Sequence, residues 1–169
     1  MTRSKAADLL EKITRIIPGI SGYQDRERRR DDDKVLRERI AETVARCRQR
    51  ISDRMNHISR SGMKGGLGTI GKLEGVNVLL ERIEDEIRYA PRGYAGWFDR
   101  EGVNLADLED LFDHDLTLLE TAGRMEESIP SGVSDEGEDW LEGLKNELEA
   151  LRRILKSRAS VIRGGEERL

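Results

Sequence analysis

Four residues with acid–base or metal-binding side chains lie close together in the sequence: Asp110, Asp113, His114 and Asp115. On a helix, Asp110 and His114 share a face and could supply two metal ligands or a carboxylate-oriented imidazole. Di-iron sites in helical bundles use Glu-x-x-His on two helices plus two further glutamates. That pattern occurs nowhere in this chain, and the other histidine, His57, has no second acid-rich face beside it. We expect solvated helix faces and no metal or other cofactor, with a metal-binding helical bundle as an alternative.

Asp31, Asp32 and Asp33 form a run of consecutive acids that resembles a metal or phosphotransfer motif. Consecutive residues on a helix point about 100° apart, so the three carboxylates cannot converge on one ion. The run also lies about one turn from three arginines, residues 28–30, a spacing that suits exposed ion pairs. The sequence therefore predicts a solvated helix face here.

Two other candidates for chemistry have structural explanations. Cys47 is the single cysteine and falls on an apolar stripe, which favours a small core residue over a nucleophile. The segment 61–75 holds six glycines, but the phosphate-loop pattern GxxxxGK[ST] fails because Leu73 follows Lys72. We predict a flexible Gly-rich loop over residues 61–72, no catalytic residue and a non-enzymatic protein.

The elements that must position these residues are all helical. Apolar periodicity predicts an all-α chain, one domain over residues 1–169, with helices at roughly 5–17, 24–58, 73–89, 105–127 and 135–163. The expected architecture is an elongated antiparallel bundle with one long second helix, roughly 50 Å at 1.5 Å per residue. Its apolar positions follow an eleven-residue repeat that predicts a straight stripe: Leu36, Ile40, Val44, Cys47, Ile51, Met55 and Ile58. We expect part of this helix to extend beyond its neighbours.

An aromatic cluster separates the third and fourth predicted helices: Tyr89, Tyr94, Trp97 and Phe98. These are four of the seven aromatic residues, and the glycines and proline among them predict a tight joint, not a continuous helix. The joint could close one end of the bundle as a hydrophobic plug or serve as a recognition surface. The candidate interaction surface comprises this cluster together with Tyr23, Arg28, Arg29 and Arg30.

Charge is distributed unevenly along the chain. Gln24 to Lys64 carries 13 basic and 8 acidic side chains, net +5, whereas Glu74 to Glu149 carries 6 basic and 22 acidic, net −16. We expect the two sets of helices to attract each other, within one chain or between copies. Nucleic-acid binding through the Arg-rich second helix is an alternative, but the interleaved acids and a pI near 5.4 disfavour it.

The sequence has no apolar run near 20 residues, its first residues lack the uninterrupted apolar core typical of a secretion signal, and its single cysteine fits a reducing compartment. We therefore expect a cytoplasmic protein without a transmembrane segment. The first helix is amphipathic, so it could dock on the bundle or make peripheral contact with an anionic membrane.

Two segments, PGISGYQDRERRRDDDKVLRERIA (18–41) and IRYAPRGYAGWFD (87–99), resemble a group of uncharacterised prokaryotic all-helical proteins. The shared positions are Pro18, Gly19, Gly22, Tyr23, Arg28 to Arg30, Asp33, Lys34, Leu36, Tyr89, Gly93, Tyr94, Gly96 and Phe98. The resemblance covers about half of the chain and carries no activity. It implies a cytoplasmic partner protein that works beside membrane-associated scaffolds. We expect a scaffold or adaptor that binds a protein partner or forms a homo-oligomer.

Overall fold

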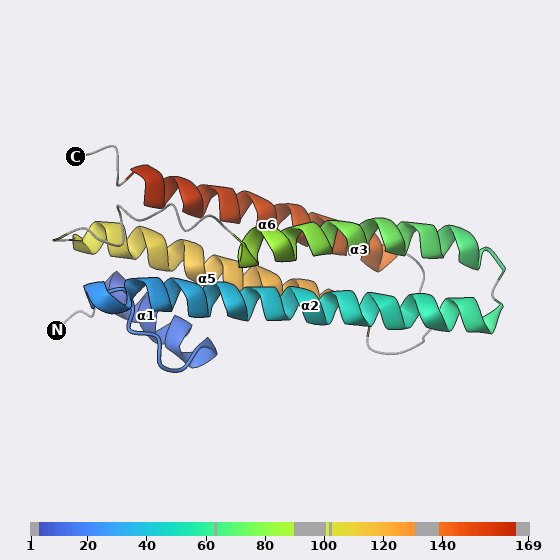
Figure 1. The fold of residues 1–169 in the computed structure, drawn as a ribbon, viewed down its shortest axis with the longest axis horizontal. Coiled ribbons are helices and arrows are strands. Elements are labelled where there is room, and N and C mark those ends of the chain that lie inside the picture. The colour runs from blue at the N-terminus through green and yellow to red at the C-terminus, as the bar shows by residue number, and fades with distance from the viewer. Residues whose placement is uncertain (1–3, 63, 90–100, 102, 131–138, 165–169) are drawn as a thin grey trace.

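The computed structural model describes residues 4–62, 64–89, 101, 103–130 and 139–164, and all regular elements in these ranges are helical. They are α1 (Lys5–Ile16), a 3₁₀ turn (Arg26–Arg28), α2 (Arg29–Ser61), α3 (Gly66–Arg88), α5 (Leu105–Ser128) and α6 (Asp139–Gly164). Figure 1 shows α2 and α3 running antiparallel, with α5 and α6 forming a second antiparallel pair beside them. The predicted elongated all-α bundle is confirmed.

The long helix α2 has the predicted straight apolar stripe. Six of its seven predicted positions are buried, and Met55 is partly buried against the same core. The helix begins at Arg29 instead of residue 24, because the Asp25 carboxylate accepts a hydrogen bond from the Glu27 amide and starts a separate 3₁₀ turn. The α2–α3 hairpin extends past the end of α5 and the start of α6, so the expected overhang is present (Figure 1).

The prediction of a Gly-rich loop over residues 61–72 is wrong. Helix α3 begins at Gly66, not near residue 73, and Gly62 and Gly65 close the turn in left-handed conformations with φ of 64° and 83°. The seven extra helical residues pair α3 with the last turns of α2, where Ile70 packs on the core. Packing against α2 therefore overrides the low helix propensity of glycine, about 1 kcal/mol per residue.

Helix α1 docks on the bundle, one of the two alternatives that its amphipathic pattern left open. Ala6, Leu9 and Ile13 are buried, and α1 packs mainly against α5. The Ser4 side chain caps the helix by accepting a hydrogen bond from the Ala7 amide at 3.3 Å. The apolar face of α1 is thus occupied within the chain.

Among the described residues, none of the helices combines the length and the apolar composition that crossing a bilayer requires.

Candidate functional site

The basic and acidic helices attract each other within the chain, as their charge distribution predicts. Arginines of α2 pair with carboxylates of α3 and α5: Arg46 with Glu126 at 2.8 Å, Arg50 with Glu126 at 3.5 Å, and Arg48 with Glu81 at 3.1 Å and Glu84 at 2.9 Å. The hydrogen bond from Arg46 lowers the pKa of Glu126. These arginines are therefore engaged at helix interfaces and are poorly placed to follow a phosphate backbone.

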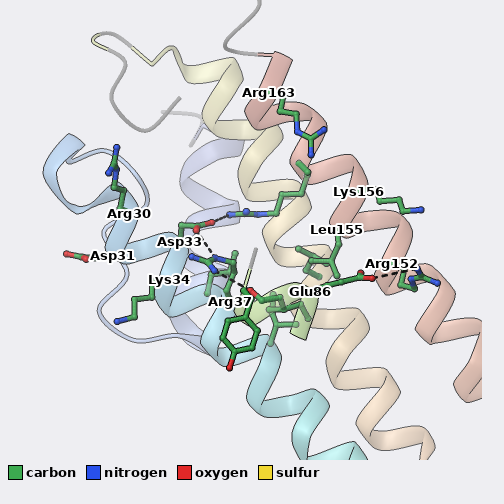
Figure 2. A pocket seen from close by; sticks show the side chains of 17 residues that line it. Arg30, Asp31, Asp33, Lys34, Arg37, Glu86, Arg152, Leu155, Lys156 and Arg163 are labelled. Atoms are coloured by element: carbon green, nitrogen blue, oxygen red, sulfur yellow. Dashed lines mark hydrogen bonds and ion pairs between the residues drawn. The ribbon is translucent and has the colours of Figure 1, made fainter. Parts of the chain in front are cut away.

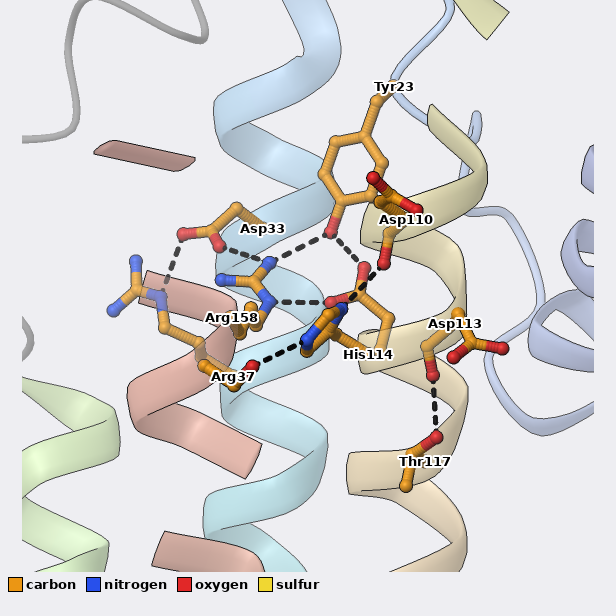
Figure 3. A network of polar contacts seen from close by, with 10 residues as sticks. Tyr23, Asp33, Arg37, Asp110, Asp113, His114, Thr117 and Arg158 are labelled. Atoms are coloured by element: carbon orange, nitrogen blue, oxygen red, sulfur yellow. Dashed lines mark hydrogen bonds and ion pairs between the residues drawn. The ribbon is translucent and has the colours of Figure 1, made fainter. Parts of the chain in front are cut away.

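A buried polar network lies near the α1 end of the bundle (Figure 3). The Tyr23 hydroxyl donates to Asp115 Oδ2 at 2.7 Å, and Arg158 Nε donates to Asp115 Oδ1 at 2.5 Å. Arg158 Nη2 also donates to the Tyr23 hydroxyl oxygen at 3.2 Å. Tyr23 and Asp115 are fully buried and Arg158 is 6% exposed, so water cannot replace these partners.

Asp33 and Arg37 extend the network to α2 and to the end of α3. Arg158 Nη2 lies 2.8 Å from Asp33 Oδ1, and Arg37 Nε donates to Asp33 Oδ2 at 2.8 Å. Arg37 Nη1 then donates to the carbonyl of Ile87 at 3.2 Å. One chain of charge-assisted bonds therefore ties α2, α3, α5 and α6 to the turn that carries Tyr23.

Asp32 holds the turn that positions Tyr23. Its carboxylate accepts hydrogen bonds from the backbone amides of Ser21 and Tyr23, both at 2.9 Å, and from the Ser21 hydroxyl. Arg29 Nε donates to the Tyr23 carbonyl at 2.7 Å. Gly22 has a φ of 74°, a left-handed conformation that residues with a Cβ rarely adopt, and an added Cβ would also lie 2.7 Å from the methyl carbons of Leu10.

The prediction that residues 31–33 form a solvated face is correct only for Asp31. Asp32 and Asp33 are 3% and 7% exposed. The helical geometry does separate the three carboxylates, as expected. Because of this separation, Asp32 contacts the turn that carries Tyr23, whereas Asp33 contacts Arg158 of α6.

Burial sets the ionisation of the network. It raises the pKa of Tyr23 well above its ordinary value, and the neighbouring Asp115 charge adds to the rise. Burial also raises the pKa of Asp115, although Arg158 opposes that shift. For Arg158, burial alone would lower the pKa, but Asp115, Tyr23 and Asp33 outweigh it and hold the pKa well above the usual value. Tyr23 therefore stays protonated and Arg158 stays charged at neutral pH, as a structural network requires.

A pocket of about 720 Å³ opens beside this network, between the first turns of α2, the end of α3 and α6 (Figure 2). We call it the α2/α6 groove. Its floor is apolar: Leu36, Ile40, Ile87, Leu118 and Leu155. Its basic side chains are Arg30, Lys34, Arg37, Arg152, Lys156, Arg158 and Arg163, and its acids are Asp31, Asp33 and Glu86. Seven positive and three negative side chains leave the groove with a formal charge of +4.

The predicted interaction surface is only partly exposed. Tyr23 and Arg29 are buried, at 0% and 6% exposure, so assigning them to a surface is wrong: both serve the turn beside α2. Arg28 and Arg30 are exposed, and Tyr89, 77% exposed, lines the α2/α6 groove together with Arg30. Tyr94, Trp97 and Phe98, and with them most of the aromatic joint, lie outside the described residues.

The candidate pair on α5 does not form a carboxylate-oriented imidazole. His114 Nδ1 donates to the backbone carbonyl of Asp110 at 2.7 Å, since a carbonyl can only accept, and Nε2 forms a hydrogen bond with the Ser157 hydroxyl at 2.9 Å. Within the described ranges, no three His, Cys, Asp or Glu side chains converge as a metal site would require. Burial raises the pKa of Cys47 to about 12, which makes its thiol a poor nucleophile.

The sequence holds a signal for the network that our predictions missed. Asp115 lies between Leu111 and Leu118, and Arg158 between Leu155 and Ile162, at the spacing of each helix's own apolar face. A charged residue at a core position of an amphipathic helix indicates a buried partner on a neighbouring helix. Periodicity could therefore have identified the participants, although it could not have paired them.

Neither a known protein family nor a curated protein nor a solved structure matches this chain. The resemblance to uncharacterised prokaryotic helical proteins therefore stays an expectation.

Proposed function

We propose that this chain is a non-enzymatic helical scaffold or adaptor that binds an acidic segment of another protein in the α2/α6 groove. The observation that carries the proposal is the groove itself, a basic pocket of about 720 Å³ with apolar surface at its base. Its volume lies within the range typical of binding sites, roughly 300–1,000 Å³.

The groove is a basic region on a chain of net charge −4. Arg30 and Lys34 lie on its α2 side, and Lys156 and Arg163 lie on its α6 side (Figure 2). An acidic segment approaching this chain would be attracted to the basic side chains of these two walls. Charge therefore supports an acidic partner and this location for it.

The buried network supports the same proposal because it holds the two walls together. Arg158 on α6 reaches Asp33 on α2, and Arg37 connects Asp33 to the end of α3. A groove whose walls are already fixed loses little conformational entropy when a partner binds. By contrast, the nucleic-acid alternative has less support, because Arg46 and Arg48 engage carboxylates of neighbouring helices.

A site-specific crosslinking experiment tests this proposal. A photoreactive residue replaces Lys156, which lines the groove, or Glu149, which is also exposed and lies on the same helix outside the groove. We expect a protein adduct from position 156 and none from position 149. The captured protein, once purified, should bind the wild-type chain at least about tenfold more tightly than a Lys34→Glu, Arg163→Glu variant. Equal adducts from both positions, or none from position 156, would count against the groove.

A further inference from the structure

We propose that the exposed face of α3 binds the same face of a second copy of this chain, with the two helices antiparallel around a twofold axis at Val78. None of the residues that carry this inference lines the α2/α6 groove, so it does not depend on the proposed function.

Helix α3 has an exposed stripe on the side opposite its core. The buried stripe lies against α2 and the core: Leu73, Val76, Leu80, Ile83 and Ile87. The opposite stripe follows the same helical steps of three and four residues, and we call it the α3 outer face: Leu67, Gly71, Glu74, Val78, Arg82 and Asp85. All six are exposed, and the apolar Leu67 and Val78 are 88% and 47% exposed. Packing within the chain therefore leaves large apolar side chains of this face in water.

The glycines of α3 are likewise not explained by packing within the chain. Gly68, Gly71 and Gly75 have open space where a Cβ would lie. Alanine at these positions would favour the helix, because glycine loses more backbone entropy on folding. A glycine on an exposed helix face does allow the backbone of another helix to approach closely. Gly71 lies on the α3 outer face, which therefore suits a helix as its occupant.

The order of charges along the α3 outer face is complementary to itself. Glu74 lies four residues before Val78, and Arg82 lies four residues after it. In an antiparallel pair centred on Val78, each Glu74 faces the partner's Arg82, and the two Val78 side chains meet at the axis. In a parallel pair, like charges would face each other and repel. Charge therefore specifies a second copy of this chain as the partner, and an antiparallel orientation.

Both charged side chains are free to make these contacts. In the part of the chain that the structure describes, neither Glu74 nor Arg82 forms an ion pair. Figure 1 shows the first turns of α3 beyond the end of α5 and the start of α6, with α2 alongside. A second copy could thus approach α3 without displacing a described helix.

The length of the α3 outer face sets the expected strength of the dimer. From Leu67 to Asp85 it covers 18 residues, about 27 Å at 1.5 Å per residue. One helix pair of this length buries less than the standard interface of about 1,600 Å². We therefore expect a reversible dimer with a Kd on the order of 10–100 µM. Because exposed charges contribute, the dimer should be weaker at high salt.

Sedimentation velocity of the full-length chain, from about 1 to 500 µM, tests the charge pattern. The mass should rise with concentration from 19.2 kDa towards twice that value. Glu74→Arg or Arg82→Glu alone places like charges opposite each other and should raise Kd at least tenfold. An equimolar mixture of these two variants should dimerise as the wild type does, because a mixed pair regains both opposite-charge contacts. Glu149→Arg makes the same charge change at an exposed position of α6 and should change Kd less than twofold.

Cysteine crosslinking tests the position of the axis. Val78→Cys should form a disulfide-linked dimer under mild oxidation, because the two copies of this residue meet at the axis. Leu67→Cys is the matched control on the same face, since its two copies would lie 22 residues apart along the helices, about 33 Å. The native Cys47 is buried and should not contribute. Circular dichroism at 222 nm should show the same helix content in every variant, as all substituted positions are exposed.

Four outcomes would overturn the inference. The first is a mass of 19.2 kDa at every concentration. The second is dimerisation that Glu74→Arg and Arg82→Glu leave unchanged, which would place the contact elsewhere. The third is a mixture of the two variants that stays monomeric. The fourth is crosslinking of Leu67→Cys that equals or exceeds that of Val78→Cys, which would reject the antiparallel pair centred on Val78.

Discussion

The buried network gives the sharpest stability prediction, through the substitution Tyr23→Phe. The ring remains, so the contact with Phe112, 6.0 Å between ring centroids, is kept. The change removes the donor to Asp115 Oδ2 and the acceptor for Arg158 Nη2. Because Asp115 is fully buried, no water can replace the lost donor. We therefore expect a loss of stability from hydrogen bonding alone.

The size of this loss follows from the charge of the acceptor. A hydrogen bond to a charged group contributes about 1.5–3 kcal/mol, and a buried carboxylate oxygen without a donor costs a similar amount. We expect Tyr23→Phe to lower the free energy of unfolding by about 2 kcal/mol. For a chain of this size, that corresponds to a fall in Tm of roughly 4–8 °C.

Urea unfolding followed by circular dichroism at 222 nm measures this change, with the slope m checked for an unchanged transition. Tyr89→Phe is the matched control, because it removes the same atom from a side chain that is 77% exposed. The control should change stability by less than about 0.5 kcal/mol. Equal losses of unfolding free energy in the two variants would refute the assignment of Tyr23 to a stabilising buried hydrogen-bond network.

The pH dependence of the stability difference between wild type and Tyr23→Phe gives a second check. The folded-state pKa of Tyr23 is raised above its ordinary value, so the stabilisation by its protonated hydroxyl is complete below about pH 10 and is lost only as the pH rises towards the folded-state pKa. The difference between wild type and Tyr23→Phe should therefore be constant from pH 7 to 9. A difference that disappears within this range would contradict the raised pKa.

Four further predictions concern other parts of the chain. Glu126→Gln should destabilise the chain at pH 7 but progressively less as the pH falls from about 5, because Arg46 lowers the folded-state pKa of Glu126 and acid removes that contribution in the wild type; urea melts across this range measure the convergence. Cys47 should react with iodoacetamide at pH 8 at least about a hundredfold more slowly in the folded chain than in urea, as its pKa of about 12 and its burial require, and mass spectrometry follows the labelling. Gly75→Ala should raise stability by about 0.5–1 kcal/mol in thermal melts, because this helical glycine has open space around its Cβ position. Asp32→Asn should cost about 2 kcal/mol in the same melts, since an amide cannot accept all three hydrogen bonds that hold the Tyr23 turn.

Features that depend on residues near each other in the sequence were predictable. The apolar spacing identified the helices, including the straight stripe of α2, because a helix places residues three and four apart on one face whatever surrounds it. The start of α5 is also local: the Asn104 side chain accepts a hydrogen bond from the Asp107 amide at 2.8 Å, a cap between residues three apart in the sequence. The uneven charge distribution likewise anticipated the ion pairs between α2 and its neighbours, because residues 24–64 are net basic and residues 74–149 are net acidic.

The candidate site depends on contacts that local patterns do not contain. The same acidic run places Asp31 in water and Asp33 against Arg158, which lies 125 residues away in the sequence, and only the packing of α6 beside α2 distinguishes them. The Gly-rich segment suggests a loop, yet it is helical from Gly66 onwards because it packs against α2. The sequence by itself determined the central part of each helix and which of its faces is apolar, because helical backbone geometry places residues three and four apart on one face. Tertiary structure alone decided which charges are buried and where the groove lies, because both depend on how far each helix extends beside the others.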